Sequence, residues 1–210
     1  LVGSEMCIRD RPSIRRAKAE GLPITAETCP HYILFDADHI PDRNTLYKCA
    51  PPIRDRENND LLIAALADGT LDIIGSDHSP APPDIKELDS GDLKKAWGGI
   101  AGLQFLLSSS WTALRNHISP EQFIPLLTSK PASFLSLKDK GELREGACAD
   151  VVIWNPDESF LVDPQSILHR HKSSPYAGLN LYGSIELTLV NGVVVYDRGS
   201  LFEGHGHLIS

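Results

Sequence analysis

A short, mostly apolar segment at residues 71–74 is followed at once by an acid and an imidazole, and this junction constrains the fold most strongly. A leucine and two isoleucines in four residues are typical of a strand buried on both faces. Gly75 breaks the run, Asp77 and His78 follow, and Pro80 prevents a continued strand. The carboxyl ends of such strands carry the chemistry in α/β proteins. The alternative, an aspartate that caps an ordinary turn, stays open on this segment alone.

Two further strand-like segments precede this junction. Residues 23–28 contain β-branched side chains and lead to His31, and residues 45–50 form a second run that closes at Pro51. A helical segment at residues 57–68, with an apolar face and a glycine after it, leads into the apolar run described above. This order predicts an α/β fold, a parallel sheet or barrel whose polar strand ends face one way. A single histidine in such a place is, however, more often a turn or core residue than a ligand.

The second half of the chain predicts packed helices and then a small β-rich unit. Helices are expected at residues 100–114, from Ser119 onward and at residues 129–137. A strand is expected at residues 149–154. The Asn-Gly pair at residues 191–192, between two β-branched runs, predicts a hairpin with a two-residue turn.

Composition excludes several classes of protein. The formal charge of −8 argues against nucleic acid or an anionic membrane as the main partner, and no apolar run is long enough to span a membrane. The amino-terminal residues lack the order of a signal peptide. Cys7, Cys29, Cys49 and Cys148 are scattered, which favours free thiols in a reducing compartment. We therefore expect a cytoplasmic protein that binds neither nucleic acid nor membranes.

Four short segments occur in a recognisable order: Glu27-Thr28-Cys29-Pro30-His31-Tyr32, Lys48-Cys49-Ala50-Pro51-Pro52-Ile53-Arg54, Ser76-Asp77-His78-Ser79-Pro80 and Ala96-Trp97-Gly98-Gly99-Ile100. Together they resemble the allantoinases, in the cyclic amidohydrolase branch with dihydroorotase and dihydropyrimidinase. The first and third segments indicate only the branch, and the second and fourth favour the allantoinases. Residues 141–154 and 174–178 also match, so the resemblance extends from Ser13 to about Phe202.

The resemblance implies an α/β fold, the last part of an eight-stranded amidohydrolase barrel followed by a small β-sandwich segment. Barrel strands six to eight and their outer helices are expected in the matched part. On that basis the chain divides into an unmatched segment, a partial barrel and a β-sandwich segment with its tail, at residues 1–12, 13–138 and 139–210.

The resemblance also implies two divalent metal ions, usually zinc, bridged by a carboxylated lysine and a hydroxide. His31 matches a metal ligand after barrel strand six. Asp77 matches the catalytic aspartate after strand eight, which binds metal and carries a proton from the bridging water to the leaving nitrogen. Neutral imidazole suits zinc, and a carboxylate beside a metal-bound hydroxide can take and return a proton near neutral pH.

Substrate contacts are implied at the ends of strands seven and eight. Cys49, Ala50 and Pro51 match the stretch that lines the pocket, and His78 lies beside the site. The implied reaction is metal-dependent hydrolysis of the cyclic amide of allantoin to allantoate, by a full-length enzyme expected to be a homo-oligomer. Two alternatives stay open. One is a cyclic amidohydrolase acting on a hydantoin, dihydropyrimidine or dihydroorotate ring, and the other is a non-catalytic interaction protein, which metal content would discriminate.

The sequence departs from the family in what precedes the match. The family's first His-x-His pair, its bridging lysine and its strand-five histidine all lie upstream of the first matching residue. We therefore expect a carboxyl-terminal portion that is inactive by itself. Two His-x-His pairs, at residues 169–171 and 205–207, lie in polar segments after the barrel. We predict that they lie far from Asp77 and hold no metal.

Overall fold

The computed structural model describes residues 11–204 and 206 of the chain. The α-helices and strands are, in chain order, α1 (Arg11–Ala19), β1 (Glu27–Thr28), α2 (Pro30–Leu34), α3 (Arg56–Ala67), β2 (Ile73–Ile74), α4 (Leu106–Leu114), α5 (Pro120–Phe123), α6 (Ser129–Phe134), β3 (Val151–Leu161), β4 (Asn180–Val190), β5 (Val193–Asp197) and β6 (Ser200–Leu201). Single 3₁₀ turns are η2 (Ala37–His39), η3 (Thr45–Tyr47), η4 (Leu103–Phe105), η5 (Ile124–Leu126) and η6 (Pro164–Ser166). No helix in the described part of the chain is long and apolar enough to cross a membrane.

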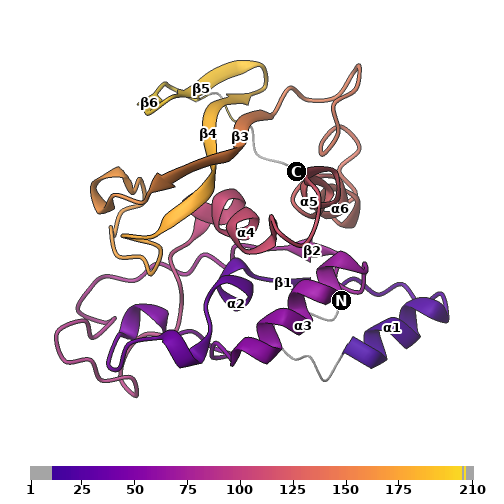
Figure 1. The fold of residues 1–210 in the computed structure, drawn as a ribbon. Helices are drawn as coiled ribbons and strands as arrows, with labels where there is room; N and C mark the ends of the chain where they lie inside the picture. Colours follow the sequence, from indigo (N-terminus) through magenta and orange to yellow (C-terminus); the bar gives the residue numbers. More distant parts are fainter. Residues whose placement is uncertain (1–10, 205, 207–210) are drawn as a thin grey trace.

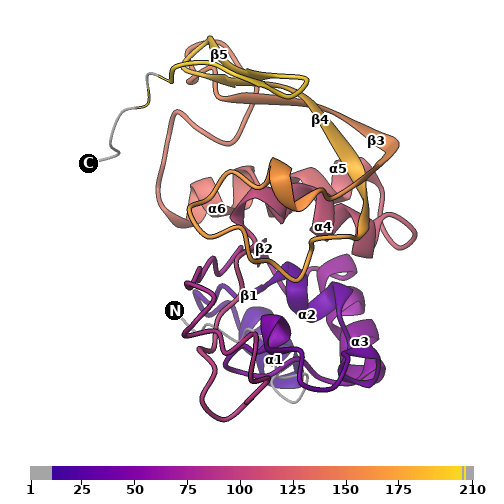
Figure 2. The same cartoon turned by 90° about the vertical axis from the view of Figure 1, so that its left-hand side faces the viewer.

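The elements lie in three levels (Figures 1 and 2). Helices α1, α2 and α3 occupy the lowest level with the short strands β1 and β2. Helices α4, α5 and α6 lie in the middle, and the sheet made by β3 to β6 lies on the far side of them. Helix α4 contacts both α2 below and β4 above, so it joins the two ends of the structure.

Helix α3 begins and ends where its sequence predicts. The side chain of Asp55 accepts a hydrogen bond from the backbone N–H of Asn58 at 3.0 Å, which caps the first turn. Gly69 follows the helix with a φ of 77°, a left-handed conformation that glycine adopts without strain. Leu62 and Leu66 are buried on the face that meets the core. The chain passes from this helix, through the turn at Gly69, into β2.

Strands β1 and β2 pair in parallel, as predicted. Glu27 lies opposite Ile73, and Thr28 lies opposite Ile74. The backbone N–H of Gly75 extends the ladder by donating to the carbonyl oxygen of Thr28 at 2.9 Å. Because the two strands run in the same direction, the residues that follow each of them lie at the same edge of this small sheet.

The predicted strand at residues 45–50 is wrong. Thr45–Tyr47 forms the 3₁₀ turn η3, where the Asn44 side chain accepts from the backbone N–H of Leu46 at 3.3 Å. The strand predicted at residues 23–28 is confirmed only at its last two positions. A strand-like segment becomes a strand only where a neighbouring strand pairs with it, and in the described residues none pairs with residues 45–50. The described lower sheet therefore has two strands, where three were expected.

The predicted helix at residues 100–114 begins later than expected. Ile100 forms an isolated parallel bridge with His78, and the backbone N–H of Ser79 donates to the carbonyl oxygen of Ile100 at 2.9 Å. The helical conformation starts only with η4 and continues into α4. Residue 100 is thus held in an extended segment beside the junction at residues 77–78.

The carboxyl-terminal strands form one antiparallel sheet in the order β3-β4-β5-β6. The predicted hairpin is confirmed: Asn191 and Gly192 both have positive φ, at 50° and 79°, as a two-residue type I′ turn requires. The helix start at Ser119 is confirmed by a capping box with Gln122. Within residues 11–204 and 206 these strands make a single sheet, not the two stacked sheets of the expected sandwich.

An aromatic cluster holds this sheet to the middle level. The Trp111 ring on α4 lies 5.5 Å from the Trp154 ring on β3 and 5.1 Å from the Phe123 ring on α5. The indole N–H of Trp111 donates to the carbonyl oxygen of Pro156 at 2.9 Å, which satisfies a buried donor. These contacts extend the hydrophobic core from the lower level to the sheet.

Candidate metal centre

The junction between β1 and α2 presents two potential ligands. Cys29 has extended backbone geometry directly after β1, and Pro30 occupies the first turn of α2. This geometry turns the chain sharply, so that Cys29 and His31 both lie at the strand end. Both side chains are buried, with exposed fractions of 2% and 1%.

Asp77 reaches the same place from the end of β2. One ligand atom each from Cys29, His31 and Asp77 lies within 4.8 Å of the other two. Asp77 has a φ of 42° and is exposed, whereas the other two side chains are buried. The convergence of His31 and Asp77 that the sequence predicts is therefore observed, with Cys29 as a third member of the group. The group is covered on the protein side and open toward solvent at Asp77.

The environment of His31 suits a metal-binding imidazole. Both of its ring nitrogens are buried, and neither has a hydrogen-bond partner among the described residues. Burial lowers the pKa of His31 to about 4, so the imidazole is neutral near pH 7. Buried polar atoms are ordinarily satisfied, and a neutral imidazole is a common metal ligand. The donor set therefore suits a divalent transition metal such as zinc.

His78 is fixed in one tautomer beside this group. Its Nδ1 atom accepts hydrogen bonds from the backbone N–H groups of Gly102 and Leu103, each at 3.2 Å. The proton of the neutral ring therefore lies on Nε2. Partial burial lowers the pKa of His78, which favours the neutral form.

The prediction that His169 lies far from the site is wrong. Its ring centroid is 5.3 Å from that of His78, the neighbour of Asp77. The loop that carries His169 is folded back by the Gln104 side chain, which donates to the Ser166 carbonyl oxygen at 3.0 Å and accepts from the Leu168 N–H at 2.7 Å. Sequence reasoning missed this because the contact joins segments about ninety residues apart. The second pair, at residues 205–207, has both histidines outside the described residues.

The predicted substrate stretch lies next to α2. The hydroxyl of Tyr32 donates to the carbonyl oxygen of Pro51 at 2.9 Å. Cys49 is buried, and burial raises the pKa of its thiol. Ala50 and Pro51 are exposed and are joined by a cis peptide bond. Because Tyr32 directly follows His31, these contacts attach Cys49, Ala50 and Pro51 to the element that carries the candidate ligand.

Comparisons with known proteins identify the family of this chain. The model of the amidohydrolase family matches residues 8–196 of the chain. The chain belongs to the amidohydrolase family. It is 42% identical over 200 residues to an allantoinase of Streptomyces avermitilis, and 40% identical over 189 residues to an allantoinase of Arabidopsis thaliana. These matches cover 95% and 89% of this chain but only 44% and 37% of the relatives, so the chain spans less than half of their length.

A solved structure agrees with this family assignment. The L-hydantoinase (dihydropyrimidinase) of Arthrobacter aurescens superposes with a TM-score of 0.87 at 31% identity. The match covers 96% of this chain and 45% of the hydantoinase. The resemblance to allantoinases is confirmed, and the amidohydrolase fold with mixed helix and strand content is confirmed with it.

The burial of Lys86 was not predicted from the sequence. Its buried ammonium group donates to the carbonyl oxygens of Lys48 at 2.8 Å, Trp97 at 3.1 Å and Gly99 at 2.6 Å. Burial lowers the pKa of Lys86 to about 8. These bonds join the two segments that favour the allantoinases in the sequence. Lys86 lies in an acidic segment that looks like a surface loop, so the neighbouring residues in the sequence do not indicate that its side chain is buried.

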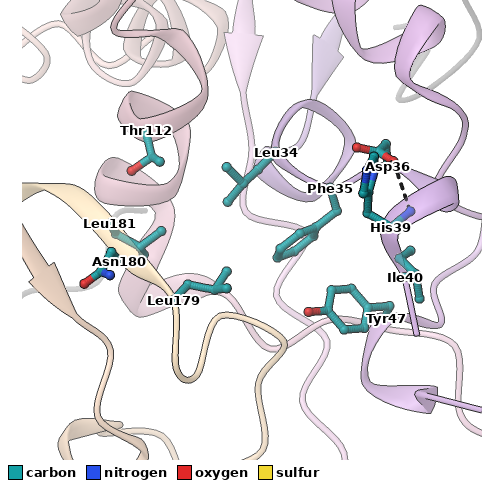
Figure 3. A pocket seen from close by; sticks show the side chains of 10 residues that line it. All are labelled: Leu34, Phe35, Asp36, His39, Ile40, Tyr47, Thr112, Leu179, Asn180 and Leu181. Atoms are coloured by element: carbon teal, nitrogen blue, oxygen red, sulfur yellow. Dashed lines mark hydrogen bonds and ion pairs between the residues drawn. The ribbon is translucent and has the colours of Figure 1, made fainter. Parts of the chain in front are cut away.

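A separate cavity lies at the other end of α2 (Figure 3). It has a volume of about 330 Å³, and Asp36 and His39 form an ion pair at one side of it. Apolar side chains and two polar ones complete the lining, and none is a predicted site residue: Leu34, Phe35, Ile40, Tyr47, Thr112, Leu179, Asn180 and Leu181. The cavity is therefore distinct from the candidate metal centre of this amidohydrolase.

Proposed function

We propose that this chain is part of an enzyme that hydrolyses the cyclic amide of allantoin to allantoate with the help of bound zinc. The observation that carries the proposal is the 39–42% identity to proteins named allantoinase over most of the chain. The geometry supports it because the candidate ligands and the predicted substrate stretch lie on adjoining elements.

His31 and Asp77 would hold the metal. The two unsatisfied ring nitrogens of His31 and the nearby carboxylate offer donors that suit zinc. When bound, the ion would polarise the ring carbonyl and lower the pKa of a water molecule.

Asp77 has the second role of moving a proton. Its exposed carboxylate would take a proton from the attacking water and give it to the ring nitrogen as the carbon–nitrogen bond breaks. The new carbon–oxygen bond leaves a carboxylate on one side and a ureido nitrogen on the other.

The remaining predicted residues would orient the ring. Cys49, Ala50 and Pro51 would line the substrate pocket, and His78 would offer its Nε2–H as a donor. The protonated Lys86 supports this arrangement by holding the backbone of Lys48.

We also propose the architecture that the family implies. Residues 13–138 would be part of the barrel, and residues 139–210 would belong to the β-sandwich segment. The parallel pairing of β1 and β2 and the superposition on the hydantoinase support this division. The full-length enzyme would be a cytoplasmic homo-oligomer, and this chain alone would turn over allantoin far more slowly than its full-length relatives.

A second substrate class is favoured by one observation. The superposed structures include hydantoinases and a dihydropyrimidinase, at identities of 31% and 27% for two of them. Hydantoin and dihydropyrimidine rings contain the same cyclic amide, so the chemistry at Asp77 would be unchanged. The higher identity to allantoinases ranks allantoin first.

The test is a chimaera in which this chain replaces the matching 200 residues of the Streptomyces avermitilis allantoinase. We expect it to hydrolyse allantoin, and Asp77→Asn to lower kcat by about a thousandfold. Asp89→Asn, which changes another exposed acid, is the matched control and should leave kcat unchanged.

The chimaera also separates the substrate classes. Preferential hydrolysis of hydantoin or dihydrouracil would favour the second class. A folded, zinc-loaded chimaera that acts on none of these rings would overturn the proposed function. The unmodified chain is assayed in parallel with added zinc, and turnover within about tenfold of the Streptomyces enzyme would contradict its expected inactivity.

A further inference from the structure

The cavity at the far end of α2 takes no part in the proposed function (Figure 3). We propose that it binds an arylalkyl ammonium compound, a primary amine joined to an aromatic ring by a short chain, with the ammonium group at Asp36 and the ring among the apolar side chains. The cavity shares no residue with the candidate metal centre. The inference is therefore independent of the reaction proposed above.

Asp36 supplies a nearly buried carboxylate at one side of the cavity. Its side chain is 9% exposed, and its Oδ1 atom accepts from the backbone N–H of His39 at 3.2 Å and lies 2.6 Å from Nδ1 of the same residue. Among the described residues, the cation nearest to Oδ2 is Arg56, whose Nη1 is 4.0 Å away, too far for a hydrogen bond. A carboxylate has about four acceptor sites. Oδ2 therefore has room for the N–H groups of a ligand.

Aromatic rings lie beside this carboxylate. The rings of Phe35 and Tyr47 meet edge to face, with centroids 4.9 Å apart and planes at 82°. Aromatic faces attract cations, and apolar walls strengthen a charge pair by excluding water. Metal ions such as calcium need six or more oxygen ligands, which these walls do not offer. A carboxylate beside aromatic rings therefore favours an organic ammonium ion.

The volume of the cavity suits a small ligand. It measures about 330 Å³, within the range of small-molecule pockets, roughly 300–1,000 Å³. Leu34 and Phe35 from the end of α2 face Leu179 and Leu181 at the start of β4 across this space (Figure 3). An aromatic ring between these side chains would bury apolar surface on both sides.

Two neutral polar groups complete the recognition. The Tyr47 hydroxyl points toward the side of the cavity that Leu179 and Asn180 form (Figure 3). Within residues 11–204 and 206, neither this hydroxyl nor the Asn180 side-chain amide has a hydrogen-bond partner. The Thr112 hydroxyl, by contrast, already donates to Ser108 and accepts from a backbone N–H. A hydroxyl group on the ligand's ring would pair with the two free groups.

Tyramine combines all of these features and is the probe. It is titrated into the purified chain by calorimetry, and amide NMR shifts locate the bound molecule. Three analogues each change one contact: tyrosol replaces the ammonium group with a hydroxyl, phloretate replaces it with a carboxylate, and phenethylammonium lacks the ring hydroxyl. We expect tyrosol and phloretate to bind at least about tenfold more weakly than tyramine, and phenethylammonium about threefold more weakly.

Variants test the residues. Asp36→Asn keeps a side chain that can cap η2 but removes the charge, and should weaken tyramine binding by about tenfold or more. Asp38→Asn changes an exposed acid of the same turn and is the matched control, with no expected loss. Tyr47→Phe should weaken tyramine binding about threefold and leave phenethylammonium binding unchanged. Circular dichroism checks that each variant is folded.

Several results would overturn the inference. They are no binding of tyramine by the unmodified chain, equal affinities for tyramine and tyrosol, and an unchanged affinity in Asp36→Asn. Shifts centred on His31 and Asp77, not on Phe35 and Leu181, would overturn it as well. If Asp36→Asn does not fold, the ligand series on the unmodified chain decides. A chimaera that hydrolyses no cyclic amide would overturn the proposed function and leave this inference intact.

Discussion

The Nζ atom of Lys86 lies 2.8 Å from the main-chain carbonyl oxygen of Lys48, 38 residues earlier in the chain. The same ammonium group reaches two more carbonyl oxygens, at Trp97 and Gly99, so that all three of its protons are donated. A buried ammonium is costly unless its donors are satisfied. Here it joins the segment before the predicted substrate stretch to the loop that follows Asp77.

Replacing this lysine should destabilise the fold. Lys86→Met keeps the apolar stem but leaves three carbonyl oxygens without their donor, and we expect a loss of about 3 kcal/mol in the free energy of unfolding. Lys94→Met, at an exposed position of the same loop, is the control and should change it by less than about 0.5 kcal/mol. Urea denaturation measures both. Equal midpoints for the two variants would show that the three bonds contribute nothing.

A buried asparagine should be equally sensitive. The side-chain amide of Asn59 on α3 donates to the carbonyl oxygens of Tyr32 at 2.6 Å and Phe35 at 2.7 Å. These bonds hold the end of α2, the helix that carries His31. We expect Asn59→Ala to cost about 2–3 kcal/mol of unfolding free energy, measured by urea denaturation. Asn58→Ala changes the neighbouring residue of the same type and should cost much less; a similar loss in both variants would contradict the prediction.

The ion pairs of Asp68 predict a pH dependence of stability. Desolvation alone would raise its pKa, but hydrogen bonds from Thr70 and the ion pairs with Arg11 and Arg15 outweigh it and lower the pKa to about 2 from an ordinary 3.8. Because the folded pKa is depressed, the contribution is complete above pH 3.8 and is lost as the pH falls to about 2.

The size of this contribution is small because the carboxylate is partly exposed and screened by salt. We expect Asp68→Asn to lower the free energy of unfolding by less than about 1 kcal/mol at pH 7. The difference from the unmodified chain should vanish near pH 2. Asp60→Asn, at a more exposed ion pair with Arg56, is the control. A difference between Asp68→Asn and the unmodified chain that persists at pH 2 would mean that the effect is not electrostatic.

The contact between His78 and His169 should also contribute to stability. His169→Ala removes a ring from a partly buried position and leaves a gap beside His78, so we expect a loss of about 1–2 kcal/mol. His171 provides its carbonyl oxygen to His169, not its side chain, so His171→Ala should retain this contact. Thermal unfolding compares the two variants. If His171→Ala is the more damaging, the ring contact is not what stabilises this loop.

The sequence by itself determined the features that depend on neighbours along the chain. The Asn191–Gly192 turn, the end of α3 before Gly69 and the helix start at Ser119 all form as predicted. Each of them uses a side chain or a φ angle that acts within a few residues, so the chemistry is visible in the sequence. The same holds for the common sheet edge of His31 and Asp77, because two parallel strands necessarily end together.

Tertiary structure decided the features that depend on distant partners. Residues 45–50 resemble a strand but form a 3₁₀ turn, because no neighbouring strand among the described residues pairs with them. Cys29 and Cys148 are the same amino acid, yet only the first lies within coordination reach of a histidine and a carboxylate. The burial of Lys86 likewise depends on carbonyl oxygens 11 to 38 residues away. Such side chains acquire their pKa values, partners and chemistry only when the folded chain brings remote segments together.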